Sequence, residues 1–167
     1  EVRVYAEQIF KGVSYLHDKD IMHGDIKTLN IIRFIIDNHL HLIDLDAAAS
    51  TLDESQTEDG IVDYVGSKFS SVCLPPELIY KLKNEVEEEL YNEYWKEEKN
   101  NNTELWNKIS PKKHKYGSFV IKTFRYESEN NRIPYEIDSL PYDLVEASKS
   151  VDVWSLGVLL YKLCTDK

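Results

Sequence analysis

A short segment near the start of the chain has residue types and spacing suited to phosphoryl transfer. Residues 23–30 read His-Gly-Asp-Ile-Lys-Thr-Leu-Asn, and Asp44 follows at the end of a hydrophobic run. Phosphoryl transfer requires a carboxylate that orients the attacking hydroxyl, metal ligands that hold the phosphates, and a cation beside the transferred group. The pattern assigns Asp25 as the carboxylate, Asn30 and Asp44 as ligands, and Lys27 as the cation.

The elements that must hold these residues are predicted as short strands. Three apolar runs fit this prediction: residues 21–22, 30–36 and 40–45. Asp37-Asn38 between the last two runs is typical of a turn. A hairpin with this turn would bring the carboxylate of Asp44 near Asn30, so that both supply oxygen ligands to one Mg²⁺ ion.

Apolar periodicity predicts the helices. Residues on one helical face recur up to an expected end near His17: Val2, Tyr5, Ala6, Ile9, Val13 and Leu16. Apolar residues that step by four through a Glu-rich sequence predict an amphipathic helix from residue 78 to about residue 99. Residues 151–164 are apolar on nearly every face and predict a buried helix.

The remaining segments carry weaker signals. Residues 47–71 are polar and are expected to run as an exposed segment, and residues 119–126 are rich in β-branched and aromatic types, which favour a strand. We interpret the Glu-rich helix as a solvated face, with a docking surface for a basic partner as the alternative. Trp95 and Trp106 are expected to pack in or beside the core. A basic patch is interpreted as surface charge: Lys112, Lys113 and Lys115.

The order of these motifs resembles that of the eukaryotic protein kinase catalytic domain. Residues 23–30 are similar to its HRD-x-K-x-x-N loop, and Asp44-Leu45-Asp46 stands where that family has DFG. Pro75-Pro76-Glu77 resembles the motif that closes the activation segment. Residues 152–161 resemble the central helix of the family, which is the most specific of the matches.

The resemblance implies an α+β, mainly helical fold, the C-terminal lobe of the kinase-like fold with short β-hairpins and an inserted subdomain. We expect residues 1–167 to be a partial protein kinase domain, without the lobe that grips most of the nucleotide. Its expected parts are a catalytic loop at 23–30, a metal loop at 44–46, an activation segment at 44–77, an insertion at about 78–148 and a central helix at about 151–164.

The resemblance also implies residue roles. Asp25 would orient the acceptor hydroxyl, Lys27 would neutralise the transferring phosphoryl group, and ATP with Mg²⁺ would be held by Asn30 and Asp44. Asp152 would anchor the backbone of the catalytic loop. Two hydrophobic stacks are implied, one with Ile32, which faces the adenine, and Leu159, the other with His23 and Leu45. Lys27 is typical of serine/threonine-directed members, so protein Ser or Thr hydroxyls are the expected acceptors.

Two residues depart from the family pattern. Gly24 replaces an arginine that pairs with a phosphate on the activation segment in many kinases, so activation by phosphorylation there is not expected. Asp46 replaces the DFG glycine, which adds a negative charge beside the metal site and restricts a backbone position that glycine leaves free.

Two alternatives remain open from the residues. Gly24 and the sequence Ile43-Asp44-Leu45-Asp46 also fit a small-molecule kinase of the aminoglycoside or choline kinase type. A catalytically inactive pseudokinase scaffold is the second alternative, because the glycine-rich loop and nucleotide-binding lysine would precede residue 1. For the same reason we expect the isolated fragment to be inactive.

Composition restricts partners and location. The formal net charge of −10 disfavours nucleic acid as a partner. The two cysteines form neither a disulfide framework nor a zinc pattern, so an intracellular, cytoplasmic location is expected. No apolar run approaches the roughly 20 residues needed to span a bilayer.

Overall fold

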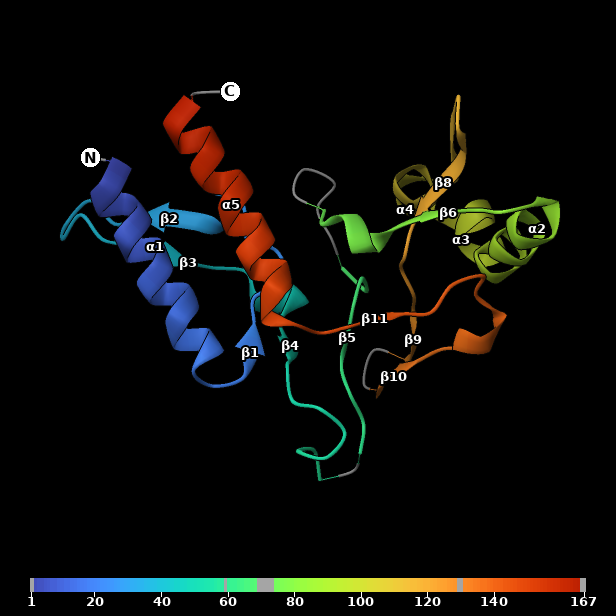
Figure 1. Cartoon of the computed structure of the whole chain (residues 1–167), viewed down its shortest axis with the longest axis horizontal. Coiled ribbons are helices and arrows are strands. Elements are labelled where there is room, and N and C mark those ends of the chain that lie inside the picture. The colour runs from blue at the N-terminus through green and yellow to red at the C-terminus, as the bar shows by residue number, and fades with distance from the viewer. Residues whose placement is uncertain (1, 59, 69–73, 129–130, 166–167) are drawn as a thin grey trace. The chain divides into compact units, whose positions relative to one another are not determined.

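The computed structural model describes residues 2–58, 60–68, 74–128 and 131–165. The chain forms two compact units, the first made of Glu1–Pro75 and Glu146–Lys167 and the second of Pro76–Val145 (Figure 1). Residues 69–73 of the expected activation segment, including Cys73, lie outside the described residues. Within the described residues, no helix has the length and apolar character needed to cross a membrane.

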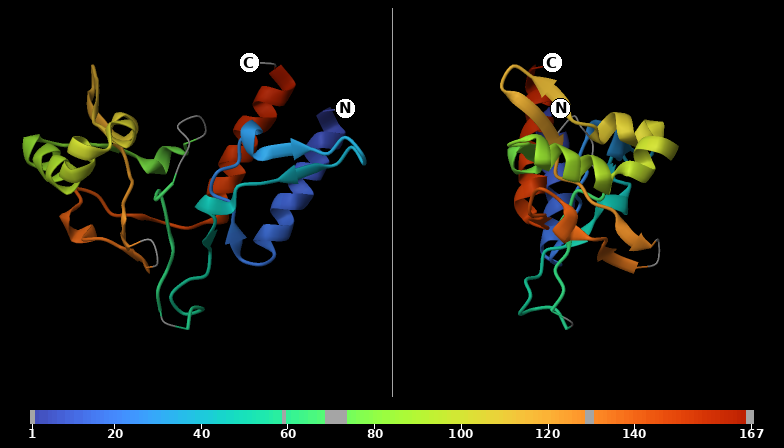
Figure 2. Two further views of the ribbon diagram at one scale, coloured as in Figure 1. Left: turned by 180° about the vertical axis from the view of Figure 1, so that it is seen from behind. Right: turned by 90° about the vertical axis from the view of Figure 1, so that its right-hand side faces the viewer.

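The first unit is built on two helices that lie side by side, α1 (Val2–His17) and α5 (Lys149–Thr165) (Figures 1 and 2). The expected end of the first helix at His17 is confirmed. Apolar side chains from both helices and from the catalytic loop form one core cluster: Ile9, Val13, Ile26, Leu156 and Leu159. Because this cluster joins both ends of the unit, burial of its apolar surface holds α5 against the N-terminal segment.

Short strand pairs connect the helices of the first unit. Antiparallel pairs form between β1 (Ile21–Met22) and β4 (Ala49–Ser50), and between β2 (Ile31–Arg33) and β3 (Leu40–Leu42). β5 (Tyr64–Val65) is paired with β11 (Val145–Glu146), where the chain returns to this unit. The turn between β2 and β3 contains Asn38 with φ 59°, a left-handed conformation that asparagine tolerates. The predicted hairpin is therefore present, with shorter strands than the apolar runs indicated.

Two expectations for the first unit need correction. The segment 47–71 is not uniformly exposed, because Ala49, Val62 and Val65 are buried. Helix α5 is buried along one face rather than all round, and Val153, Trp154 and Tyr161 are exposed. Its apolar residues surround the helix, and the buried ones include Leu156 and Leu159, which pack in the core cluster with Ile9 and Val13 of α1 and with Ile26.

The second unit combines three helices with a small sheet. The helices are α2 (Glu85–Tyr94), α3 (Lys96–Asn101) and α4 (Thr103–Ile109). The sheet has strand order β6 (Ile79–Lys81), β8 (Gly117–Ile121) and β7 (Lys112–His114). A separate antiparallel pair joins β9 (Tyr126–Ser128) to β10 (Asn131–Pro134).

Two sequence predictions for the second unit were wrong in their boundaries. The predicted helix from residue 78 begins only at Glu85, where Asn84 accepts the Glu87 N–H as N-cap. Residues 79–81 instead form β6, because pairing with the distant β8 overrides the local periodicity. The predicted strand at 119–126 is divided between β8 and β9.

Aromatic side chains form the core of the second unit. Tyr91, Trp95 and Tyr142 are buried, and the ring centroid of Tyr91 lies 6.4 Å from that of Trp95 and 6.2 Å from that of Tyr142. The Tyr91 hydroxyl donates to Ile109 O at 2.8 Å, and the Tyr142 hydroxyl donates to Thr123 O at 3.0 Å. Trp95 is thus in the core as expected, whereas Trp106 is half-buried beneath the Lys99 ammonium.

This core predicts loss of stability in alkali. Burial raises the pKa of both the Tyr91 and the Tyr142 phenol. In the unfolded chain these phenols ionise near pH 10, so above about pH 10 the unfolded state binds fewer protons and the free energy of unfolding falls. We expect urea unfolding midpoints that are flat below that pH and decline above it.

The control for this prediction is phenol removal. Tyr91→Phe and Tyr142→Phe should each lower stability at neutral pH, because each leaves a buried carbonyl without its donor. Each should also make the alkaline decline shallower. An unchanged alkaline slope in both variants would contradict the assignment of the decline to these phenols.

Candidate active site

A buried carboxylate on α5 holds the catalytic loop. Asp152 is 0% exposed; its Oδ2 accepts the His23 N–H at 2.8 Å and its Oδ1 accepts the Gly24 N–H at 2.9 Å. His17 Nε2, at the end of α1, lies 2.9 Å from the same Oδ2. The expected contact between Asp152 and the loop backbone is confirmed, and the two helices and the loop are linked through one side chain.

The imidazole of His23 joins the catalytic loop to the segment that leads to Asp44. Its Nδ1 accepts the Asp25 N–H at 3.4 Å and its Nε2 lies 3.1 Å from Ile43 O, which assigns the proton to Nε2. The Ile43 N–H in turn donates to Asn30 O at 3.0 Å. Because Ile43 is bonded on both sides, the position of the next residue, Asp44, is fixed relative to the loop.

Asp25, Lys27 and Asn30 lie in direct contact. The Lys27 ammonium donates to Asp25 Oδ2 at 2.5 Å, and the Asn30 side-chain amide donates to the same oxygen at 3.1 Å and to Asp25 O at 2.9 Å. Asp25 Oδ1 accepts no hydrogen bond from any described residue. One carboxylate oxygen is therefore held by two donors, and the other is available to a hydroxyl.

The expected metal ligands present oxygen atoms without competing partners. The Nδ2 of Asn30 is used within the loop, while its Oδ1 accepts no hydrogen bond in the part of the chain that the structure describes. The exposed Asp44 carboxylate likewise makes no hydrogen bond or ion pair there, and its backbone is left-handed with φ 66°. An amide oxygen and a carboxylate suit Mg²⁺, which prefers hard oxygen ligands.

Gly24 occupies a position that no other residue fits. Its φ is +77°, and a Cβ placed there would lie 2.3 Å from Ala47 O. Ala47 ends the 3₁₀ helix Leu45–Ala47 that follows Asp44. The replacement of the family arginine by glycine therefore allows the catalytic loop and the metal loop to pack closely.

The second departure from the family pattern, Asp46, is paired with a cation. Lys68 Nζ lies 2.6 Å from Asp46 Oδ2, and the ammonium, through this hydrogen bond and its charge, lowers the pKa of the Asp46 carboxyl. The φ of Asp46 is not among the positive values of the chain, so no glycine is required at this residue. Lys68 is the only basic residue in the sequence of the segment 47–71. This is the feature of the sequence from which the contact with Asp46 could have been predicted.

The residues expected in hydrophobic stacks are only partly in place. Leu159 is buried in the core cluster, and Ile31 packs against that cluster. Ile32, the next residue on β2, points to the opposite face and is 42% exposed. Leu45 is 51% exposed, while His23 is fully buried. Ile32, the residue expected to face the adenine, thus has an exposed apolar side chain.

Sequence reasoning missed His17 and Ile43. His17 is 135 residues from its partner Asp152, and Ile43 contributes only backbone atoms, so neither carried a signal in residue type or spacing.

Comparison with known proteins gives a family. The family model described as the protein kinase domain matches residues 1–96, which is more than half of the 167 residues. The chain belongs to the protein kinase domain family, as the motifs predicted. No solved structure matches it.

Individual relatives match over short segments. The chain is 39% identical over 57 residues to probable cyclin-dependent kinase 9 of Schizosaccharomyces pombe, which covers 33% of this chain and 9% of that protein. It is 59% identical over 34 residues to eukaryotic translation initiation factor 2-alpha kinase 1 of Plasmodium falciparum, covering 20% of this chain and 2% of the relative. It is 46% identical over 46 residues to serine/threonine-protein kinase AtPK2/AtPK19 of Arabidopsis thaliana, covering 28% and 10% respectively. The chain thus matches a tenth or less of each relative's length.

The geometry of Gly24 predicts a large effect of a small substitution. Gly24→Ala should lower the free energy of unfolding by about 1–3 kcal/mol from backbone strain alone, and contact with Ala47 O adds to that loss. The matched control is Gly157→Ala in α5, where a Cβ meets nothing within 4 Å and helix propensity should add about 0.5–1 kcal/mol. Urea unfolding of both variants distinguishes the two effects; equal stability would contradict the close packing at Gly24.

The role of Asp152 as an anchor predicts local opening of the loop. Asp152→Asn replaces one acceptor by an amide donor, which leaves a buried N–H of His23 or Gly24 unpaired at a cost of about 1–3 kcal/mol. Amide hydrogen exchange at these two residues should become faster. The control is Asp18→Asn, an exposed carboxylate without a hydrogen-bonded side chain among the described residues, which should leave both exchange rates unchanged.

Proposed function

We propose that the protein transfers a phosphoryl group from ATP to serine or threonine hydroxyls of protein substrates. This proposal rests on the different surroundings of the two carboxylate oxygens of Asp25. Its Oδ2 is held by Lys27 and Asn30, and its Oδ1 has no partner among the described residues. A fixed carboxylate with one open oxygen is the arrangement required to orient an acceptor hydroxyl.

Asp25 and Lys27 act together in this proposal. The open Oδ1 accepts the hydroxyl proton, which keeps the oxygen lone pair directed at the phosphorus atom. The Lys27 ammonium lies 2.5 Å from the other oxygen. It neutralises negative charge that spreads over the phosphoryl oxygens in the transition state.

Asn30 and Asp44 are the residues that would hold Mg²⁺, and Ile32 contributes an exposed apolar face beneath the adenine. When held by these ligands, Mg²⁺ would supply positive charge that reduces the repulsion between the phosphate group and the incoming hydroxyl. The contribution of the chain is to fix the two ligands with respect to each other through Ile43, whose N–H donates to Asn30 O at 3.0 Å.

Two features support a protein kinase that is active on Ser or Thr. Lys27 is the residue found at this position in serine/threonine-directed members, and the Arabidopsis relative is a serine/threonine-protein kinase. The Asp46 carboxylate, the local argument for an inactive scaffold, is neutralised by Lys68 in this structure. An uncompensated charge beside the metal ligands is therefore avoided.

The domain assignment belongs to the same proposal. We assign the chain to the C-terminal lobe, with the catalytic loop at 23–30, the metal loop at 44–46, the activation segment at 44–77 and the central helix at about 151–164. The compact unit Pro76–Val145 corresponds to the insertion at about 78–148.

Radiolabel transfer from Mg²⁺-ATP tests the proposal in the full protein that carries this chain. We expect labelling of Ser and Thr in a protein panel, and a loss of about 10²–10⁴-fold in the Asp25→Asn variant, which lacks the base. Asp18→Asn is the matched control and should label normally. Retention of ATP binding by Asp25→Asn would show that the variant is folded.

Two results would overturn the proposal. Labelling restricted to small alcohols or amines would place the protein among small-molecule kinases. Absence of labelling, in a protein that is folded and binds ATP, would indicate a scaffold.

A further inference from the structure

The small sheet of the second unit has one face toward the tyrosine core and a second face that carries several exposed side chains. Tyr80 of β6 is paired with Val120 of β8, and both face the tyrosine core, where the Tyr80 ring lies 5.3 Å from that of Tyr142. Side chains alternate between the faces of a strand, so the neighbours of these residues point the other way. Lys81 of β6 and Phe119 of β8 therefore lie on the second face of the sheet.

Strand register gives the arrangement of the second face. Phe119 of β8 is the partner of both Lys81 on β6 and Lys112 on β7. These three side chains therefore lie in one row across the sheet, with the aromatic ring between two lysines. His114, two residues after Lys112, is on the same face, and its ring centroid lies 6.4 Å from that of Phe119.

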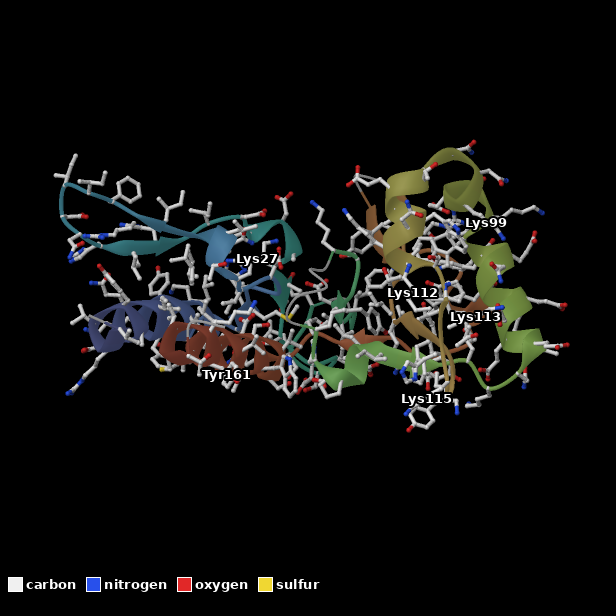
Figure 3. The ribbon with its side chains drawn as sticks, turned by 90° about the horizontal axis from the view of Figure 1, so that it is seen from above. Lys27, Lys99, Lys112, Lys113, Lys115 and Tyr161 are labelled. Atoms are coloured by element: carbon white, nitrogen blue, oxygen red, sulfur yellow. The ribbon has the colours of Figure 1, made fainter. Side chains whose placement is uncertain are left out.

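The tip of the β7–β8 hairpin extends this row. The Tyr116 ring lies 5.3 Å from the His114 ring, and the Lys115 ammonium lies 4.7 Å from the centroid of the Tyr116 ring. Figure 3 shows Lys112, Lys113 and Lys115 along this hairpin. We name the resulting surface the basic face and define it by six residues: Lys81, Lys112, His114, Lys115, Tyr116 and Phe119.

Two of the lysines of the basic face are held in position. A Cβ at Gly117 would lie 2.8 Å from Cε of Lys81, so the absence of a side chain at Gly117 lets the lysine stem lie across the hairpin. Lys112 Nζ donates to Asn107 O at 2.6 Å and to Ser110 Oγ at 2.9 Å. Cations that are already oriented lose less conformational entropy when an anion binds.

The charge of the basic face is not compensated within the described residues. No carboxylate among them forms an ion pair with Lys81, Lys112 or Lys115, although the chain carries ten more acidic than basic residues. Some other lysines of the same unit do form ion pairs, such as Lys96 with Glu93 and Lys108 with Glu104. From the sequence, the lysines of the β7–β8 hairpin were expected to be surface charge. The strand register places Lys81 and Lys112 on either side of the Phe119 ring.

We infer that the basic face binds an acidic segment of a partner protein, one rich in Asp and Glu. Carboxylates would pair with the lysine ammonium groups, and the side chains between them would contact the exposed ring of Tyr116 and the half-buried ring of Phe119. A short acidic segment interacts mainly with the local field, because repulsion from distant carboxylates is screened beyond about 8–10 Å. Nucleic acid fits less well, because a longer polyanion would extend over the acidic remainder of the chain.

This inference is independent of the proposed phosphoryl transfer, since it involves no residue of the candidate active site. It concerns recruitment of a partner and not the reaction. A failure to detect binding of an acidic segment would therefore leave the role proposed for Asp25 unchanged.

Fluorescence anisotropy with defined probes tests the inference on the whole chain. The probes are a fluorescein-labelled peptide of alternating Asp and Ser, the same peptide with Asn in place of Asp, and oligouridine. We expect the Asp peptide to bind at low ionic strength and to dissociate at high ionic strength, and the Asn peptide to show no binding. The Lys81→Glu and Lys115→Glu variants should each weaken binding by about ten-fold or more.

Lys113→Glu is the matched control for these variants. Lys113 is on β7 beside Lys112 but is the partner of Ser118, so its side chain points to the opposite face. It makes the same change in net charge and should weaken binding by no more than about two- to three-fold. Lys81 lies on β6, and Lys115 lies in the turn between β7 and β8. If one of these two variants fails to fold, the other variant still tests the inference.

Four results would overturn the inference. The first is equal binding of the Asn peptide, and the second is tighter binding of oligouridine than of the Asp peptide. The third is an equal effect of Lys113→Glu and Lys81→Glu. The fourth is a dimer in sedimentation velocity that Lys81→Glu dissociates, which would assign the basic face to a second copy of this chain.

Discussion

The buried carboxylate of Asp152 connects the parts of the first unit that matter for chemistry. A carboxylate removed from water is strongly destabilising unless donors replace the lost hydration. Here the backbone N–H groups of His23 and Gly24 and the imidazole of His17 supply them. These partners come from residues about 130 positions earlier in the sequence, so satisfying one buried charge requires α1, the catalytic loop and α5 to adopt their positions together.

The hydrogen bonds that Asp152 accepts also fix the loop that carries the residues proposed to act in phosphoryl transfer. His23, held by its backbone, uses its two ring nitrogens to contact the backbone of Asp25 and of Ile43. Gly24 then allows the two loops to approach at a distance that a Cβ would prevent. The backbone segments that carry Asp25, Asn30 and Asp44 are thus linked by hydrogen bonds through His23 and Ile43, and the proposed phosphoryl transfer would require such rigid support.

The second unit is held together by an aromatic core and not by a buried carboxylate. Its tyrosine and tryptophan side chains make a core in which the buried hydroxyls of Tyr91 and Tyr142 are paired with backbone carbonyls, which satisfies the polar atoms of these two rings. Strand alternation directs Tyr80 and Val120 to this core and leaves Lys81, Phe119 and Lys112 on the other side. A positive, aromatic surface on an acidic chain is a consequence of that register.

The sequence by itself determined the family, the helix that ends at His17 and the hairpin turn at Asn38, because these depend on local periodicity and on short spacings; the roles of the phosphate-directed residues stay predictions. It misplaced the start of α2 and joined β8 and β9 into one predicted strand, since pairing between distant strands outweighed local propensity. Only the tertiary structure showed that Asp46 meets Lys68, that Gly24 has no room for a side chain and that the lysines of β6 and β7 share one face. Each of these depends on contacts between residues far apart in the chain, which spacing along a single sequence does not encode.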